Sequence, residues 1–194
     1  MAVPNNASNV STGKPRATGA IFVAPKGTAL PTDATTPLVE AFVNLGYASE
    51  DGLVNGIETD TNDINAWGGD TVLSVQTSYK ETFTTNLIET KEAVLSQYYG
   101  PENVAVDGEG NITVKHNSKQ LPEQVAVVET VLADGRIKRT VIPAAQISDR
   151  SGETTYTDGD AIAYPIVWNA KPSAAWDGDT ARDFIAAVDE PESV

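Results

Sequence analysis

Short runs of β-branched residues on either side of glycine turns dominate the second half of the chain. One such pair of runs flanks Asp107–Gly110, and another, QVAVVETVLADGRIKRTVI, flanks Asp134-Gly135. Valine, isoleucine and threonine suit a pleated strand, and Asp-Gly suits the tight turn between two strands. The pattern predicts two β-hairpins and a mainly β protein.

Further strands are predicted by apolar or alternating segments. Alternation of apolar and polar residues with a period of two is typical of a half-buried strand. Turns are expected at Glu50–Gly52 and at Ser78–Lys80, and Pro165 favours an edge position or a bulge because proline cannot donate to a ladder. The segments cover residues 19–25, 39–49, 71–77, 80–89 and 160–170.

One short helix is predicted over residues 91–99. Thr90 is a plausible N-cap, and Gly100-Pro101 supplies a stop signal after the last turn. The stripe of Val94, Leu95 and Tyr98 is expected to pack on a sheet.

About seven or eight short strands with one helix indicate a β-sandwich or a partly closed barrel with one flanking α-helix. A chain of 194 residues is expected to form one such domain, over residues 19–170. Residues 1–18 are predicted to be a flexible N-terminal arm and residues 171–194 a C-terminal arm. Residues 125–132 are apolar on both strand faces, which suggests that a neighbouring molecule covers one face.

The composition excludes several kinds of chemistry. Thirteen lysines and arginines face 27 acidic residues, giving a net charge of −14 that disfavours tight binding to nucleic acid. The chain has no cysteine and a single histidine, His116, and it has no apolar run that predicts a signal peptide or a membrane span. No residue is singled out for catalysis, so an enzyme is not expected.

Metal and cofactor sites are not predicted either. An EF-hand loop starting at Asp60 would place Ile64 and Thr71 where oxygen ligands are required. The two Asp-Gly-Asp segments, at 158–160 and 177–179, leave open a weak calcium site of another kind.

The stretch GIETDTNDINAWGGD, residues 56–70, is an acidic segment between predicted strands and is expected to be a long loop. Trp67 within it has two readings. It tucks under its own loop, or it is an anchor of the kind that dominates protein interfaces. Trp176 in the tail presents the same choice.

Three segments together resemble a known family. ATGAIFVAPKGTALPTD, FVNLGYASEDG and AWGGDTVLSVQTSYKETFTTNLIETKEAVLSQYYG follow one another between Ala17 and Gly100. This ordered set is similar to the tail tube (major tail) proteins of long-tailed bacteriophages. The resemblance implies a structural virion protein that forms hexameric rings, stacked into a hollow tube through which DNA passes to the host.

The resemblance also implies which residues make contacts. The long loop would touch the next ring, and the C-terminal arm would bridge subunits through Trp176 and Phe184. The polar strand residues Ser74, Gln76, Thr84 and Asn86 are candidates for the channel wall. The loop contacts would come from Glu58, Asp60, Asp63, Ile64, Trp67 and Asp70.

Partners and location follow from the same resemblance. The chain itself would be the main partner, joined by tape-measure, tail terminator and baseplate or tip proteins, with assembly in the host cytoplasm and no membrane contact. Two alternatives remain open. One is a free-standing β-sandwich binding module, such as a virion decoration or adhesin domain with a weak calcium site, and the other is the inner tube of a contractile secretion machine.

Overall fold

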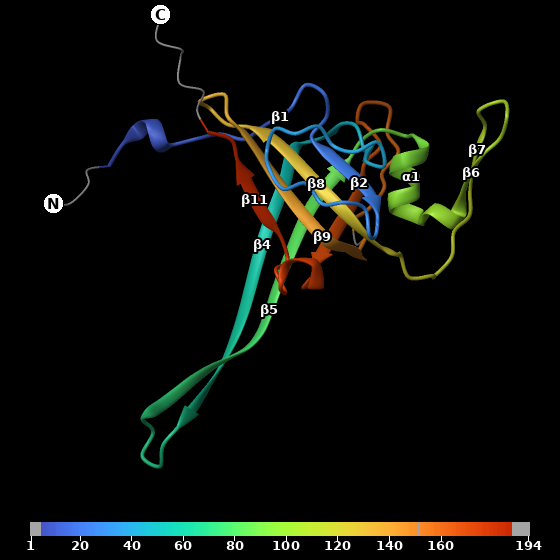
Figure 1. The fold of residues 1–194 in the computed structure, drawn as a ribbon. Helices are drawn as coiled ribbons and strands as arrows, with labels where there is room; N and C mark the ends of the chain where they lie inside the picture. Colours follow the sequence, from blue (N-terminus) through green and yellow to red (C-terminus); the bar gives the residue numbers. More distant parts are fainter. Residues whose placement is uncertain (1–4, 151, 188–194) are drawn as a thin grey trace, which may run out of the picture.

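A computed structural model describes residues 5–150 and 152–187 (Figure 1). Within them lie one α-helix and three short 3-10 helices, at Ala7–Asn9, Pro101–Asn103 and Ala174–Trp176. The remaining elements, in chain order, are β1 (Lys14–Pro15), β2 (Ile21–Pro25), β3 (Val43–Asn44), β4 (Ala48–Asn65), β5 (Thr71–Leu87), α1 (Glu92–Tyr99), β6 (Val104–Val106), β7 (Ile112–Val114), β8 (Glu123–Val131), β9 (Ile137–Asp149), β10 (Tyr164–Ala170) and β11 (Arg182–Ile185).

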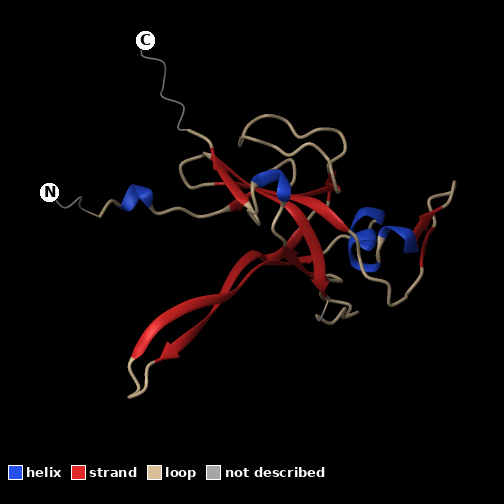
Figure 2. Ribbon diagram, turned by 60° about the horizontal axis from the view of Figure 1, so that its bottom comes forward, coloured by secondary structure: helices blue, strands red, loops and turns tan. Residues whose placement is uncertain are grey.

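Nine strands form one antiparallel sheet in the order β3-β2-β8-β9-β10-β5-β4, with β1 added to β8 and β11 added to β9. The sheet is not closed, and the structure is consistent with the predicted β-sandwich carrying one helix. The two predicted hairpins are confirmed as β6–β7 and β8–β9. Strands β6 and β7 form a separate small ribbon beside α1 (Figure 2).

The main core lies between the curled sheet and α1. Trp168 of β10 and Phe83 of β5 are buried there with Val94 and Leu95 of α1, as the predicted helix stripe requires. Tyr98 is partly buried against the same cluster. This packing, more than intrinsic propensity, stabilises so short a helix.

The predicted C-terminal end of α1 is confirmed, whereas its predicted N-cap is not. Gly100 ends the helix at φ 102° and donates its N–H to the carbonyl of Ser96, so the predicted stop is confirmed. The predicted N-cap is wrong, because Lys91 occupies that position and makes no side-chain cap. The hydroxyl of Thr90 is instead hydrogen-bonded to that of Tyr164, at 3.0 Å.

Strand β8 is covered on both faces by its own chain. Ala126 belongs to the main core, whereas Val125 and Val127 belong to a second cluster with Val141 and Trp176. Partly buried side chains from the segment after β2 and from β11 pack on that second cluster: Leu30, Leu38, Phe42 and Phe184. The prediction that a neighbouring molecule covers this strand is therefore wrong.

Strand β10 is an interior strand, between β9 and β5. Pro165 pairs with Asn86 of β5, and pairing with β9 begins only at Val167, where the register also shifts. Proline is tolerated at position 165 because β9 does not yet pair with β10 there, so the missing N–H costs no hydrogen bond to β9. The expected edge position is wrong for the strand as a whole, but the expected irregularity is present two residues later.

Two predicted turns do not exist. Residues 50–52 lie inside β4, where the register shifts between Ala48 and Leu53, and residues 78–80 lie inside β5. The predicted long loop over 56–70 is also wrong, since it is mostly strand and only residues 66–70 turn. Strands β4 and β5 thus form one long hairpin that projects well beyond the body (Figures 1 and 2).

Parts of both predicted arms contact the body. Lys14 and Pro15 pair with Val131 and Thr130 of β8. In the C-terminal segment, β11 pairs with β9 from Arg182 to Ile185. Residues 1–4 and 188–194 lie outside the described residues, and whether the arms are flexible remains a prediction.

Candidate functional site: the projecting hairpin

The outer half of the β4–β5 hairpin lacks a third strand among the described residues. Strand β10 pairs with β5 only as far as Glu81, and from Lys80 to Thr71 β5 pairs with β4 alone. A two-stranded ribbon exposes both of its faces, so side chains that alternate along it all meet solvent. The term outer hairpin is used below for residues 56–80.

The outer hairpin exposes many large apolar side chains. Trp67, in the turn, is fully exposed at 107% relative accessibility, and Ile64 and Leu73 pair directly across the ribbon next to it. Exposed apolar groups on a projecting element make it a candidate interaction site. The others are Ile57, Val72, Val75 and Tyr79.

The turn that carries Trp67 is built by two glycines. Gly68 and Gly69 have φ values of 126° and 102°, which side-chain-bearing residues rarely adopt. The N–H of Ala66 donates to the carbonyl of Asp70 at 2.7 Å, and the N–H of Gly69 donates to the carbonyl of Ala66 at 3.0 Å. The closed turn holds Trp67 outward, so the reading in which it tucks under its own loop is wrong.

Polar pairs across the ribbon fix its register. Ser74 donates to Asp63 at 2.5 Å, and Ser78 donates to Asp60 at 2.7 Å. Lys80 lies 3.7 Å from Glu58. Three of the four predicted contact carboxylates are thus already engaged within the ribbon, and Asp70 contributes its backbone to the turn.

The candidate wall residues fall on two different faces. In an antiparallel ladder, directly paired residues share a face. Thr84 pairs with Val54 and Ser78 with Asp60, both at even positions of β4, whereas Ser74 pairs with Asp63 and Gln76 with Thr61, at odd positions. The register shift between Asp60 and Thr61 causes the change, because a bulge inverts the alternation of the strand that carries it.

The predicted C-terminal contacts lie within the subunit. Trp176 is buried at 9% accessibility, and its ring meets that of Phe184 edge to face at a centroid distance of 6.2 Å. The guanidinium of Arg182 lies 4.6 Å from the centre of the Trp176 ring, close enough for a cation–π contact. For Trp176 the structure supports packing in its own core.

The other side chains considered for chemistry make contacts within the subunit. The ring of His116 lies against that of Tyr99, with centroids 4.4 Å apart. Asp179 pairs with Arg182 at 2.6 Å, and Asp160 accepts a hydrogen bond from Thr157 at 3.0 Å. In residues 5–150 and 152–187, no three histidine or acidic side chains cluster as metal ligands would, and no helix is long and apolar enough to cross a membrane.

Sequence reasoning missed the exposed apolar residues of β5. Leu73 and Val75 alternate with Ser74 and Gln76, and that pattern was assigned to a half-buried strand. Tyr79 was placed in a predicted turn. The sequence of β4, the acidic strand paired with β5, could have indicated this exposure. A strand with Asp or Glu on both faces, such as residues 58–63, fits poorly against any core.

Among the described residues, an open antiparallel β-sheet, one α-helix and a long projecting hairpin define a mainly β protein. A family model for phage tail tube proteins matches residues 3–181. The chain therefore belongs to the phage tail tube protein family, which confirms the resemblance. No curated protein sequence matches it.

Proposed function

We propose that copies of this chain close into hexameric rings, and that the rings stack into the hollow tail tube through which phage DNA is delivered to the host. The observation that carries the proposal is the outer hairpin, with exposed apolar side chains around Trp67. Within residues 5–150 and 152–187 nothing covers these groups, whereas another copy would supply an apolar partner. Family membership supports the same conclusion.

Head-to-tail contacts between unlike surfaces close into rings or run on as filaments, depending on the rotation between copies. Two strands, β3 and β4, end the sheet order of the described residues, and such edges favour lateral pairing between copies. The net charge of −14 per copy would repel DNA from the tube, so the cargo would slide without sticking. Of the four candidate wall residues, Thr84 and Asn86 share the outward face of the sheet, and Ser74 and Gln76 share one face of the outer hairpin.

Further partners follow from this role. Tape-measure, tail terminator and baseplate or tip proteins would bind the ends or the interior of the tube, after assembly in the host cytoplasm. A free-standing calcium-binding module would behave differently, because calcium would raise its melting temperature while it stayed a monomer or a small closed oligomer.

Negative-stain electron microscopy of the purified protein over a range of concentrations tests the proposal. We expect hollow tubes whose end views show six-fold symmetry. Because each copy is acidic, tubes should form at lower protein concentration when added salt screens the repulsion. A protein that stays monomeric at high concentration and high salt would contradict the proposal.

A truncation that respects the strand register isolates the role of the arm. Glu58 and Lys80 pair directly, so residues 59–79 can be replaced by Asn-Gly, which suits a two-residue hairpin turn. Removing only 56–69 would leave β5 unpaired over several residues. The truncated chain should keep its core and its thermal transition but form no tubes.

A further inference from the structure

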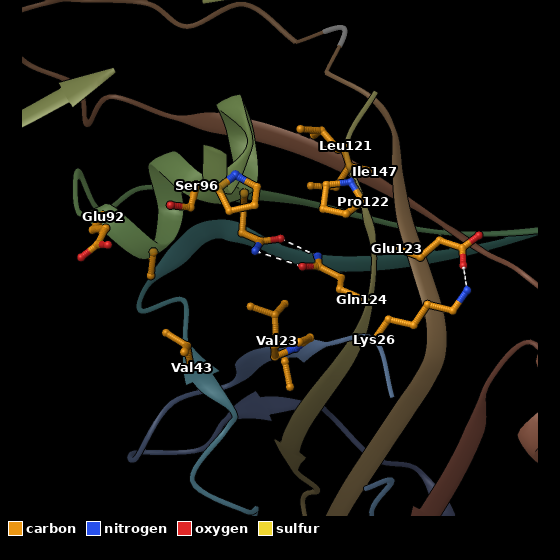
Figure 3. A pocket seen from close by; sticks show the side chains of 15 residues that line it. Val23, Lys26, Val43, Glu92, Ser96, Leu121, Pro122, Glu123, Gln124 and Ile147 are labelled. Carbon is orange, nitrogen blue, oxygen red and sulfur yellow. Dashed lines mark hydrogen bonds and ion pairs between the residues drawn. The ribbon is translucent and has the colours of Figure 1, made fainter. Parts of the chain in front are cut away.

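An apolar groove lies between α1 and the adjoining ends of β2 and β8 (Figure 3). Its volume is about 570 Å³, within the range of sites that bury a ligand or an aromatic anchor. The amides of Gln97 and Gln124 are hydrogen-bonded to each other, so they do not compete for an occupant. The apolar lining comes from Val23, Val43, Ala93, Leu121, Pro122 and Ile147.

One rim of the groove carries a surplus of positive charge. Lys26 and Lys171 both bind Glu123, at 2.5 and 2.8 Å, so two cations share one carboxylate. Lys171 lies beside the lining, and the remaining charged lining residue, Glu92 in the first turn of α1, lies on the far side of the groove from Lys26 (Figure 3). An acidic occupant is therefore favoured on the lysine side of the groove.

The outer hairpin has the complementary chemistry. It contains four carboxylates and one lysine, and Trp67 stands fully exposed at its end. Its tip and α1 lie at opposite ends of the molecule, so a chain cannot fill its own groove (Figure 1). We propose that the groove receives the hairpin tip of a second copy, with the Trp67 indole against its apolar wall and the tip carboxylates toward Lys26 and Lys171.

This inference rests on the proposed tube and names the surface that accepts the arm. A projection and a socket on different surfaces of one chain form a heterologous contact. An open stack then has a free projection at one end and a free socket at the other. Stacking then continues without a change in the fold. A buried tryptophan in such a contact is the kind of residue that dominates interface energy.

Cross-linking tests the contact directly, because the chain contains no cysteine. One protein would carry Ala66→Cys beside Trp67, and a second would carry Ser96→Cys in the groove. Mixed under assembly conditions and oxidised, or treated with a short bismaleimide, they should give a covalent dimer of the two. Ala133→Cys replaces Ser96→Cys in the control, since Ala133 is exposed at the opposite end of β8.

A blocking variant gives a second measurement. Ser96→Trp should fill the groove and raise the protein concentration needed for tubes at least tenfold, whereas Ala133→Trp should leave it unchanged. Circular dichroism and the melting temperature establish that both variants are folded. If Ser96→Trp misfolds, the cysteine pair, which adds little volume, still decides the question.

The outcomes separate this inference from the proposed function. If the wild type forms tubes but the Ala66→Cys and Ser96→Cys proteins give no cross-link, the groove is overturned as acceptor while the tube itself stands. Wild-type protein that never forms tubes would overturn both. A cross-link as strong with Ala133 as with Ser96 would show unspecific contact and would also overturn the inference.

Discussion

Arg139 donates from Nε and Nη2 to one carboxylate oxygen of Glu129, at 2.9 and 2.5 Å, and both side chains are buried. Arg16 donates to the other oxygen at 2.8 Å. The remaining guanidinium group, Nη1, donates to the backbone carbonyl of Asp33 at 2.7 Å. One ionic cluster therefore joins β8, β9, the segment after β2 and the residues that follow β1.

Replacing Glu129 by Gln should destabilise the subunit strongly. Removing one partner of a buried pair leaves the other charge unpaired, which costs about 3–5 kcal/mol. The free energy of unfolding in denaturant measures the effect. Arg136→Gln is the matched control, because its pair with Asp134 is exposed to solvent and should contribute little to stability. Equal losses in the two variants would contradict the assigned role of the buried cluster.

Stability should fall in acid partly through Glu123. Hydrogen bonds from Lys171 and then Lys26 lower the pKa of Glu123 from its ordinary value of 4.5 to about 2. Since the folded-state pKa is the lower one, the stabilisation is complete above pH 4.5 and is lost as the pH falls through about 2. Glu123→Gln should therefore be less stable than wild type near neutral pH, and the gap should close by about pH 2. Denaturant unfolding at several pH values measures the gap, and a gap independent of pH would contradict this origin.

Gly46→Ala should cost more than Gly135→Ala. Both glycines have positive φ, 80° and 87°, so each substitution carries about 1–2 kcal/mol of backbone strain. A Cβ at Gly46 would also lie 2.1 Å from Oε1 of Glu89, which accepts a hydrogen bond from the N–H of Tyr47, whereas a Cβ at Gly135 meets nothing within 4 Å. Displacing Glu89 should add about 1 kcal/mol. Melting curves of the two variants compare the costs, and equal costs would show that Glu89 moves freely.

Trp67 should report assembly by fluorescence. Trp168 and Trp176 are buried, whereas Trp67 is fully exposed, so a soluble quencher such as acrylamide should act mainly on Trp67 in the monomer. Trp67→Phe should remove the quenchable component and change the free energy of unfolding by less than about 0.5 kcal/mol. In polymers the quenchable component of the wild type should disappear. Quenching that is equal in monomer and polymer would show that Trp67 is not buried on assembly.

Local turn chemistry made parts of the fold predictable. The turns at Asp107–Gly110 and Asp134-Gly135, the strand at residues 21–25 and the end of α1 at Gly100 all depend on residues close in sequence. The two-sided burial of β8 was not predictable in this way. Its second face is covered by Trp176 and by the segment after β2, which are distant in sequence.

The position of the candidate site could be predicted from the sequence, but its conformation could not. The acidic stretch at 56–70 marks the hairpin correctly, yet it was predicted as a loop because its strand buries neither face. Trp67 carries no local signal that distinguishes a satellite core from an exposed anchor. Ser74 and Thr84 lie on opposite faces of the hairpin because of a one-residue bulge, which the alternation of apolar and polar residues alone does not reveal.

Strand β5 runs without interruption from the tip of the arm into the body, and its inner end forms seven consecutive residue pairs with β10. Tension applied to the tip along the arm would load those pairs in shear, so they would have to rupture together. Peeling, which breaks pairs singly and at lower force, would require a sideways pull. In the proposed tube, the arm could therefore carry axial tension from one subunit to the next without unfolding the body.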